Sequence, residues 1–227
     1  MKVSIVVPAY DMKGNGVRFL SHLLATVEAQ DYKDVEVIVS DDSKEDEIEM
    51  LCKAASSKLD IKHVRHETQG RSSPNVNNAI RHASGDIIKV LFQDDFFIDR
   101  RALTMIVNEH KNGAKWVLAG CVHTNDGVNF YRYHVPSFNP KGYMGENLAG
   151  APSLVSFQND GDTFFDDSLA WLMDCEFYHR LFLKWGSPKI VPSPLTADRI
   201  WDGRVSSTVN EGVKSFEACY VWRKFND

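Results

Sequence analysis

The sequence predicts an α/β protein with a mostly parallel sheet that helices flank on both faces. Short β-branched and apolar runs alternate with segments of helical periodicity through the first half of the chain, which is typical of repeated strand–helix units. The run at 87–92 has the character of a buried strand and is followed by two adjacent carboxylates, Asp94 and Asp95. In such a sheet, ligands bind at the carboxyl ends of the strands.

Each expected element follows from a local pattern. In the first half, we expect strands at 3–7 (stopped by Pro8), 35–39, 61–64 and 87–92, and helices at 17–30, 44–58 and 72–82. In the second half, we expect helices at 101–112, 169–185 and 211–225, and strands at 116–123, 130–135, 153–157 and 189–191. The Gly- and Pro-rich segment 136–152 and the polar segment after residue 191, up to Ser207, are expected to be loops.

Composition narrows the class of protein. The 227 residues carry a formal net charge of −5, which argues against nucleic acid as the main partner. No run of eighteen apolar residues is present, so we expect no transmembrane segment. The four cysteines lie far apart and form no CxxC motif, which favours a reducing, cytoplasmic location.

Two nucleotide-binding motifs are excluded. A dinucleotide-binding fold needs GxGxxG in the first strand-to-helix turn. Here Gly14-Asn15-Gly16 comes late after the first strand, and Phe19 stands where the third glycine is needed. The P-loop pattern is also absent.

Acidic residues follow several of the expected strands, and four segments together resemble the family 2 glycosyltransferases of GT-A fold. Residues 3–11 look like the opening strand of that family, and residues 36–43 look like its second strand with the following acidic turn. Residues 70–88 are similar to the segment before the DxD motif, and residues 172–181 to the helix that carries the catalytic carboxylate. The resemblance spans roughly residues 2–207. It implies one domain over 1–227, with a nucleotide-sugar-binding half (1–98) and an acceptor-binding half (99–227).

The resemblance also implies roles for individual residues. Asp174 matches the catalytic base, which takes the proton of an acceptor hydroxyl. Asp94 matches the last Asp of the DxD motif and, with Asp95, would hold Mn²⁺ or Mg²⁺ against the donor diphosphate. Asp41 would accept a hydrogen bond from the nucleotide base, and Arg71 would reach the base or a phosphate. The remaining expected substrate-binding residues are Pro8, Ala9, Tyr10, Asp11, Asn77, Gln93, Glu176 and Trp201.

The implied reaction is transfer of a sugar from a nucleotide diphosphate donor, with a UDP-sugar as the expected class, to a hydroxyl of a glycan, lipid-linked or protein acceptor. A single base without a second carboxylate nucleophile favours inversion at the anomeric carbon. We expect the acceptor between loop 136–152 and the helix of Asp174, with residues 139–150 as a lid. Peripheral membrane contact is compatible with this expectation.

The sequence departs from the family pattern at three positions. Phe92 replaces the first Asp of the DxD motif, Met173 replaces the acidic residue before the base, and no His lies near Trp201. A non-catalytic nucleotide- or glycan-binding module therefore remains the alternative. A nucleotidyltransferase is disfavoured, because the loop after the first strand lacks the Gly and Lys residues that handle a triphosphate.

Each acidic segment also has a purely structural interpretation. Residues 41–43 could cap the next helix. Asp94 and Asp95 could form a solvated turn, and Asp174 and Glu176 could lie on the exposed face of an amphipathic helix. The functional interpretation rests on their joint occurrence.

Overall fold

The computed structural model describes residues 1–66 and 70–227. Its strands are β1 (Val3–Ala9), β2 (Val35–Asp41), β3 (Ile61–Arg65), β4 (Ile87–Val90), β5 (Phe96–Phe97), β6 (Trp116–Thr124), β7 (Phe130–His134), β8 (Val155–Gln158) and β9 (Lys189–Arg199). Its helices are α1 (Gly16–Glu28), α2 (Glu47–Ala55), α3 (Ser72–Arg81), α4 (Ala102–Lys111), α5 (Met173–Trp185), α6 (Val205–Thr208) and α7 (Glu211–Asn226), with 3₁₀ turns η1 (Gly142–Met144) and η2 (Pro152–Leu154).

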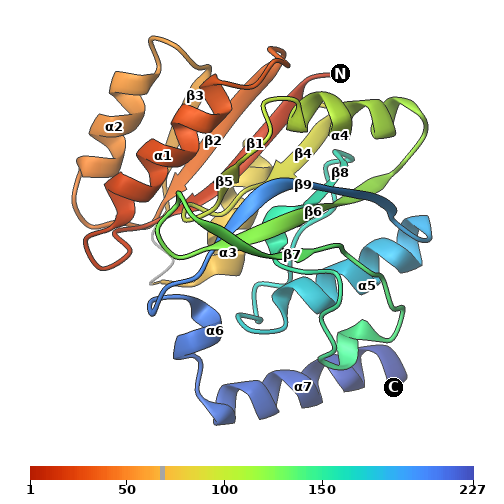
Figure 1. Ribbon diagram of the computed structural model, residues 1–227. Coiled ribbons are helices and arrows are strands. Elements are labelled where there is room, and N and C mark those ends of the chain that lie inside the picture. The colour runs from red at the N-terminus through yellow and green to blue at the C-terminus, as the bar shows by residue number, and fades with distance from the viewer. Residues whose placement is uncertain (67–69) are drawn as a thin grey trace.

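One twisted sheet runs through the molecule in the order β3-β2-β1-β4-β8-β6-β9-β5, and β7 pairs with β6 (Figure 1). Strands β3, β2, β1 and β4 are parallel, as predicted. In the second half, β8 runs antiparallel to both β4 and β6, whereas β9 is parallel to β6. The predicted α/β class is therefore confirmed, while parallel pairing dominates only the first half of the sheet.

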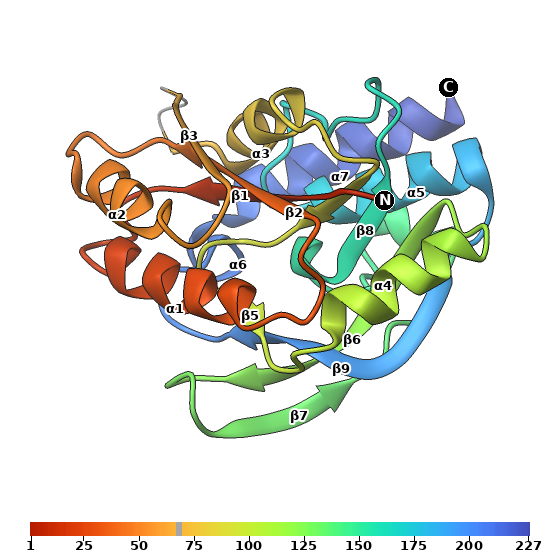
Figure 2. The same ribbon diagram turned by 90° about the horizontal axis from the view of Figure 1, so that it is seen from above.

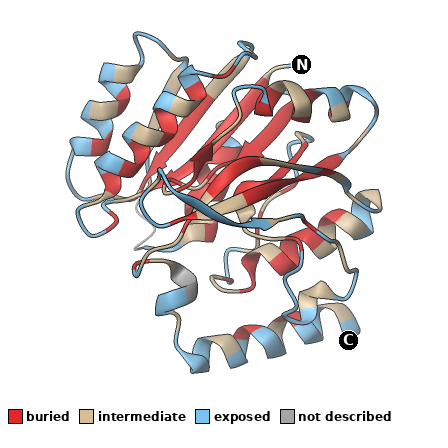
Figure 3. Cartoon of the chain, viewed as in Figure 1, coloured by how far each residue is buried: buried red, intermediate tan, exposed pale blue. Residues whose placement is uncertain are grey.

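Helices cover both faces of this sheet (Figure 2). One face packs against α1, α2 and α4 through side chains such as Leu23, Ile48 and Leu103. The other face packs against α3, α5 and α7. Neighbouring residues of β1 point to opposite faces, so Ile5 lies in the first core and Val6 in the second. A strand covered on both faces is apolar at most positions, and the buried strands stand out in Figure 3.

The largest correction to the sequence prediction concerns β9. A three-residue strand and a polar loop were expected, but the strand continues from Lys189 to Arg199 along β6. Pro192 and Pro194 made the segment resemble a loop, because proline cannot donate to a ladder. The pairing shifts register around Gly120, where a Cβ would lie 2.5 Å from the Pro192 carbonyl oxygen. This irregularity lets the strand pass the prolines and carry its last residues to the edge of the sheet.

The bounds of other strands and helices also differ from the prediction, because contacts between distant segments determine where they begin and end. Strand β1 does not stop before Pro8 but continues to Ala9, with Pro8 opposite Ser40. Strand β4 ends at Val90, before the expected residue 92, and α2 spans only 47–55. Helix α5 begins at Met173 rather than 169. The segment before it is held instead by Glu217 of α7, whose carboxylate accepts hydrogen bonds from the amides of residues 170–172.

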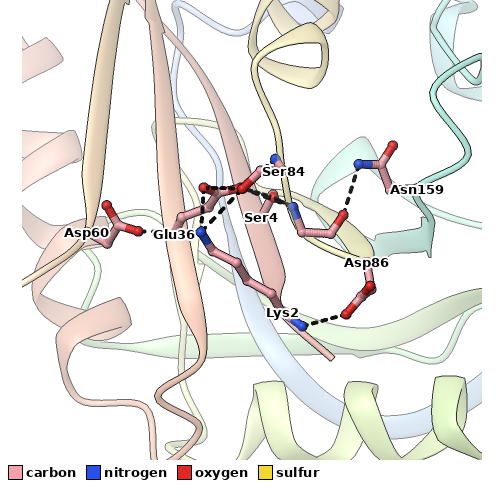
Figure 4. A network of polar contacts seen from close by, with 8 residues as sticks. Lys2, Ser4, Glu36, Asp60, Ser84, Asp86 and Asn159 are labelled. Atoms are coloured by element: carbon pink, nitrogen blue, oxygen red, sulfur yellow. Dashed lines mark hydrogen bonds and ion pairs between the residues drawn. The ribbon is translucent and has the colours of Figure 1, made fainter.

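A polar network closes the amino ends of β1, β2 and β4, opposite the acidic edge (Figure 4). The Glu36 carboxylate accepts hydrogen bonds from Lys2 Nζ at 2.8 Å, from Ser4 Oγ at 2.5 Å and from the Ser84 amide at 2.6 Å. Burial by itself would raise the pKa of Glu36, but these donors outweigh it and lower the pKa to about 2. The ionised carboxylate therefore joins three strands at their starts.

We predict that this network makes folding stability depend on pH. The pKa of Glu36 falls from about 4.5 to about 2 on folding, so its contribution is present above pH 4.5 and is lost as the pH falls toward 2. Glu36→Gln should lower the free energy of unfolding by about 2 to 3 kcal/mol at pH 7, with a smaller difference at pH 3. Urea unfolding followed by tryptophan fluorescence measures both values.

Asp60→Asn is the matched control, because Asp60 also faces Lys2, at 3.5 Å, but is 68% exposed. It should change the free energy of unfolding by less than about 0.5 kcal/mol. Equal losses in the two variants would contradict the role given to Glu36.

Candidate active site

Gln93 connects the loop after β1 to the end of β4. Its side chain is fully buried. Its Oε1 accepts a hydrogen bond from the Tyr10 amide, and its Nε2 donates to the Gly16 carbonyl, both at 2.8 Å. A Cβ at Gly16 would lie 2.4 Å from the Tyr10 carbonyl oxygen, so the loop needs glycine there. The predicted site residues Tyr10 and Gln93 are thus brought together, with Gln93 as a brace.

Asp94 lies next to this brace and is held by the end of β9. Its Oδ2 accepts a hydrogen bond from Trp201 Nε1 at 2.8 Å, and its carbonyl oxygen accepts one from Arg199 Nε at 3.0 Å. The Trp201 ring in turn packs edge-on against Phe19 of α1, with ring centroids 5.5 Å apart. The predicted residues Asp94 and Trp201 therefore form a direct pair.

Asp95 points into the protein rather than toward solvent and is only 4% exposed. Its Oδ1 accepts a hydrogen bond from the Arg199 amide at 3.0 Å. Burial and the nearby charges of Asp94 and Asp198 raise the pKa of Asp95 well above its usual value. Burial likewise raises the pKa of Asp94 and of Asp198, and Asp198 adds to the effect on Asp94. Three carboxyl groups thus share one poorly solvated region.

This region would suit a divalent cation. Carboxyl groups that lie close together and are poorly solvated are costly to ionise, and a hard cation, which prefers oxygen ligands, would stabilise their ionised form. Across residues 1–66 and 70–227, no group of three or more His, Cys, Asp or Glu side chains is arranged to hold a metal ion by itself. Asp94 and Asp95 could therefore hold an ion only together with ligands from outside the chain, such as the oxygens of a diphosphate.

Arg199 and Asp198 were not predicted as site residues, because the segment that carries them was expected to be a loop. Arg199 is 3% exposed, and its guanidinium lies over the rings of Phe19 and Phe96, 4.6 and 5.2 Å from their centroids. Asp198 lies 3.8 Å from His123. The available signal was the pair of charged residues directly after the Leu-Thr-Ala run at 195–197.

Lys89 is a second residue that the sequence analysis missed. Its side chain is fully buried in β4, and its ammonium donates to the carbonyls of Ser153 and, at 3.4 Å, Val155. Burial lowers the pKa of Lys89 to about 7, while the charge of Asp95 acts in the opposite direction. In its protonated form, Lys89 therefore places a positive charge near Asp95.

Asp41 ends β2 and is completely buried. Its Oδ1 accepts a hydrogen bond from the Ser43 amide, and its Oδ2 contacts His63 Nε2, both at 2.9 Å. Burial would raise the pKa of Asp41, but these bonds and the charge of Arg65 lower it. Asp41 is therefore an ionised carboxylate held by protein donors, and the expected bond to a nucleotide base remains a prediction.

The other residues that were expected to bind the donor differ in their exposure to solvent. Pro8 and Ala9 are buried in β1, whereas Asp11 is exposed and its carboxylate accepts from the Gly14 amide. Arg71 is exposed at the start of α3 and donates to the Asp167 carbonyl. The segment 67–69 next to it, which belongs to the family-like stretch, lies outside the described residues.

Asn77 and Glu176 are engaged in bonds that hold the fold together. Asn77 is 1% exposed, and its amide bonds the backbone of Phe165 in both directions at 2.8 Å. Glu176 is fully buried between Arg180 Nε at 2.5 Å and Lys224 Nζ at 2.9 Å. Both side chains therefore stabilise the fold, and their expected contact with the substrate remains a prediction.

Asp174, the expected base, lies in the first turn of α5. Its Oδ1 accepts from the Cys175 amide at 2.7 Å, and its Oδ2 accepts from Asn147 Nδ2 at 2.6 Å. Burial raises the pKa of Asp174 to about 6, although these hydrogen bonds act in the opposite direction. Its partners come from α5 and from loop 136–152, whereas those of Asp94 come from the segment 199–201.

The fold and the acidic strand ends define a nucleotide-sugar transferase type of architecture, and the sequence assigns the chain to a family. The pattern of Glycosyl transferase family 2 matches residues 4–182. The chain therefore belongs to glycosyl transferase family 2, as predicted.

Individual relatives share parts of the chain. The GalNAc(5)-diNAcBac-PP-undecaprenol beta-1,3-glucosyltransferase of Campylobacter jejuni is 29% identical over 129 residues, which cover 56% of this chain and 40% of that protein. An uncharacterized glycosyltransferase of Rickettsia typhi is 25% identical over 240 residues, covering 98% of this chain and 71% of the relative. The chain thus spans less than half of the Campylobacter protein.

Solved structures share the fold. TarS 1-349 of S. aureus in complex with UDP-GlcNAc aligns with a TM-score of 0.72 and 20% identity, over 96% of this chain and 64% of that chain. The mannosyltransferase PcManGT of Pyrobaculum calidifontis in complex with GDP-Man and Mn²⁺ aligns with a TM-score of 0.63 and 18% identity, over 95% and 59%. These likenesses confirm the predicted GT-A fold. Among the described residues, no helix has the length and apolar character needed to cross a membrane.

We predict that Gln93→Leu destabilises the protein, because both the Tyr10 amide and the Gly16 carbonyl lose their partner. Two unpaired backbone groups should cost about 2 to 4 kcal/mol in the free energy of unfolding. Chemical denaturation measures the loss. Gln158→Leu serves as the control, since the Gln158 side chain accepts from the exposed Lys115 ammonium. This substitution should cost less than about 0.5 kcal/mol. Similar values for the two variants would show that Gln93 is not the brace.

Proposed function

We propose that this chain is a metal-dependent glycosyltransferase that transfers a sugar from a nucleotide diphosphate donor, of the UDP-sugar class, to an acceptor hydroxyl. The observation that carries the proposal is the buried acidic group of Asp94, Asp95 and Asp198 at the carboxyl ends of β4 and β9, in a chain of family 2. Residues 1–98 form the donor half, and residues 99–227 form the acceptor half.

The donor lies along the loop after β1 and the end of β2. Residues 8–11 line the base and ribose, and Asp41 and Arg71 contact the base or a phosphate. TarS in complex with UDP-GlcNAc and PcManGT in complex with GDP-Man and Mn²⁺ share this fold, which supports a nucleotide sugar as the ligand class.

Asp94 and Asp95 would hold Mn²⁺ or Mg²⁺ beside the diphosphate. When bound, such an ion stabilises the charge that develops on the departing nucleoside diphosphate. The buried carboxylates supply the hard oxygen ligands that these ions prefer. Trp201 orients Asp94 by bonding one of its two oxygens, which leaves the other oxygen for a ligand.

Asp174 acts as the base. A pKa of about 6 keeps the carboxylate mostly ionised at neutral pH yet makes it a better proton acceptor than an ordinary Asp. It takes the proton of the acceptor hydroxyl while the hydroxyl oxygen attacks the anomeric carbon. A single base and direct displacement lead to inversion.

The acceptor class is the least specified part of the proposal. The name of the Campylobacter relative includes an undecaprenol-linked glycan, which supports a lipid-linked acceptor, peripheral membrane contact and a cytoplasmic site of action. A glycan or protein acceptor remains the alternative.

We predict that Asp94→Ala abolishes metal-dependent donor binding. A thermal-shift screen with UDP-glucose, UDP-GlcNAc and GDP-mannose, each with and without Mn²⁺, should show an Mn²⁺-dependent rise for the wild type, because ligand binding stabilises the native state. Asp94→Ala should lose that rise. Asp34→Ala should keep it, since Asp34 is 59% exposed at the opposite edge of the sheet. A full Mn²⁺-dependent shift in Asp94→Ala would refute the metal site.

We predict that Asp174→Asn spares donor binding but lowers transfer by about 10² to 10⁴-fold, the range for loss of a general base. In the wild type, the rate should increase with pH up to about 6 and then level off, because the base works when it is deprotonated. NMR of the product should show an inverted anomeric configuration. Asp162→Asn, an exposed site in the preceding loop, is the control.

A wild-type rate of transfer in Asp174→Asn would show that Asp174 is not the base. Donor binding by the wild type without any hydrolysis or transfer would instead favour the non-catalytic module.

A further inference from the structure

The turn at 147–150 covers the start of α5. Asn147 Nδ2 donates to Asp174 Oδ2 at 2.6 Å and to the Gly150 carbonyl at 3.2 Å, while the Gly150 amide donates to Asn147 Oδ1 at 2.9 Å. Asn147 itself is exposed, and Leu148 is 42% exposed. The turn is thus closed by its own bonds and attached to α5 through the Asp174 carboxylate and through the Tyr178 hydroxyl, which donates to the Gly150 carbonyl at 3.2 Å.

The oxygen that Asn147 occupies is the one an acceptor would need. Of the two oxygens of Asp174, Oδ1 accepts from the Cys175 amide of its own helix and Oδ2 accepts from Asn147 of the turn. An acceptor hydroxyl that gives its proton to Oδ2 would need the position that the Asn147 amide now takes. The two donors would compete for the same position.

A second polar atom lies under the same turn. Nε2 of His134, at the end of β7, is buried and has no hydrogen-bond partner. A Cβ placed on Gly150 would lie 3.1 Å from this nitrogen and 2.6 Å from Leu154 Cδ2, so the backbone of the turn lies directly against the imidazole. A buried polar atom without a partner is costly, and a ligand that displaced the turn could supply the missing partner.

The space beneath the turn is too small for a sugar in this arrangement. The cavity between the turn and α5 has a volume of about 10 Å³ and is lined by Asn147, Cys175 and Tyr178, among others, which is room for about one water molecule. Gly145 and Gly150, with φ of +105° and +92°, bound the segment at positions that favour glycine. An acceptor that enters between the turn and α5 must therefore move the segment.

The adjoining part of the loop is fixed more firmly. Tyr143 packs on His179 of α5 and on Phe225 of α7, with ring centroids 4.3 and 5.1 Å apart, and His179 Nδ1 contacts the Pro140 carbonyl oxygen at 2.8 Å. The segment after Gly145 can then move while residues 140–143 stay in place.

We infer that residues 145–150 form a lid that the acceptor opens, with Asn147 as a positioning residue that occupies Asp174 Oδ2 until an acceptor hydroxyl replaces it and a sugar group reaches His134 Nε2. That the incoming group is a sugar hydroxyl rests on the proposed function. The closed lid holds Asp174 Oδ2 in a hydrogen bond, which keeps the base from activating a water molecule and so protects the donor from hydrolysis.

The replacement leads to a balanced transfer step. The acceptor oxygen forms a bond to the anomeric carbon, and its proton moves to Asp174 Oδ2. The bond between the anomeric carbon and the diphosphate oxygen breaks, and the nucleoside diphosphate leaves with the electron pair. The Asn147 amide cannot take part, because it is a donor that keeps its proton.

The native thiol of Cys175 tests the lid directly, because it is 5% exposed and lines the cavity under the turn. Asn147→Ala and Asn147→Asp should increase the rate at which N-ethylmaleimide labels Cys175 by about 10-fold or more, as followed by peptide mass spectrometry. Cys52, buried in α2, is the internal reference for global unfolding and should keep its rate.

Asn129→Ala is the matched control, since Asn129 is an exposed loop residue whose amide also bonds a carboxylate, that of Asp126, at 2.7 Å. It should leave labelling of Cys175 unchanged. Wild-type labelling of Cys175 in both Asn147 variants, or an equal increase at Cys52, would overturn the lid.

A second measurement uses water as the acceptor. With UDP-GlcNAc and Mn²⁺, Asn147→Ala should hydrolyse the donor several-fold faster than the wild type, and adding Asp174→Asn should remove the increase. An increase in labelling without an increase in hydrolysis would show that Asn147 does not restrain the base. If donors bind to no variant, the proposed function fails, while the labelling result still decides whether the lid exists.

Discussion

Negative charge buried at one edge of the sheet is the constraint on which the rest of this structure depends. Burial raises the pKa of Asp94, Asp95 and Asp198, and the charge of Asp198 adds to the effect on the other two. Such an arrangement persists only if the surrounding protein supplies donors and positive potential. The chain does so with groups from several elements, and their positions explain why β9 extends along β6 to the site.

Arg199 contacts both adjacent aspartates and both neighbouring aromatic rings. Its amide bonds Asp95, its Nε bonds the Asp94 carbonyl, and its guanidinium lies between the rings of Phe19 and Phe96. One residue of the second half thereby fixes the end of β4 and the start of α1. Burial still raises the pKa of these carboxyl groups, which is the physical reason that a cation is proposed there. The opposite edge of the sheet is organised differently. There the ionised Glu36 carboxylate accepts hydrogen bonds from Lys2, Ser4 and Ser84, so it needs no ligand.

Several residues that the family resemblance assigned to substrate binding also hold elements of the fold together. Glu176 and Asn77 match family positions, but Glu176 anchors α7 to α5 through Lys224, and Asn77 ties α3 to the backbone of Phe165. Their burial could not be derived from the sequence, because an amphipathic pattern does not tell which neighbouring element covers a polar position. The same limit concealed Lys89, which appears in sequence as one charge within an apolar strand.

The sequence by itself determined the α/β class, the four parallel strands of the first half and the family, because periodicity and acidic strand ends are local features. The family resemblance also predicted roles for Asp94, Asp95 and Asp174, which remain predictions. Only the tertiary structure decided the length of β9, the bond from Trp201 to Asp94 and the contact between Asn147 and Asp174. Each of these joins residues distant in the chain, so pairing and burial, rather than local propensity, determine them.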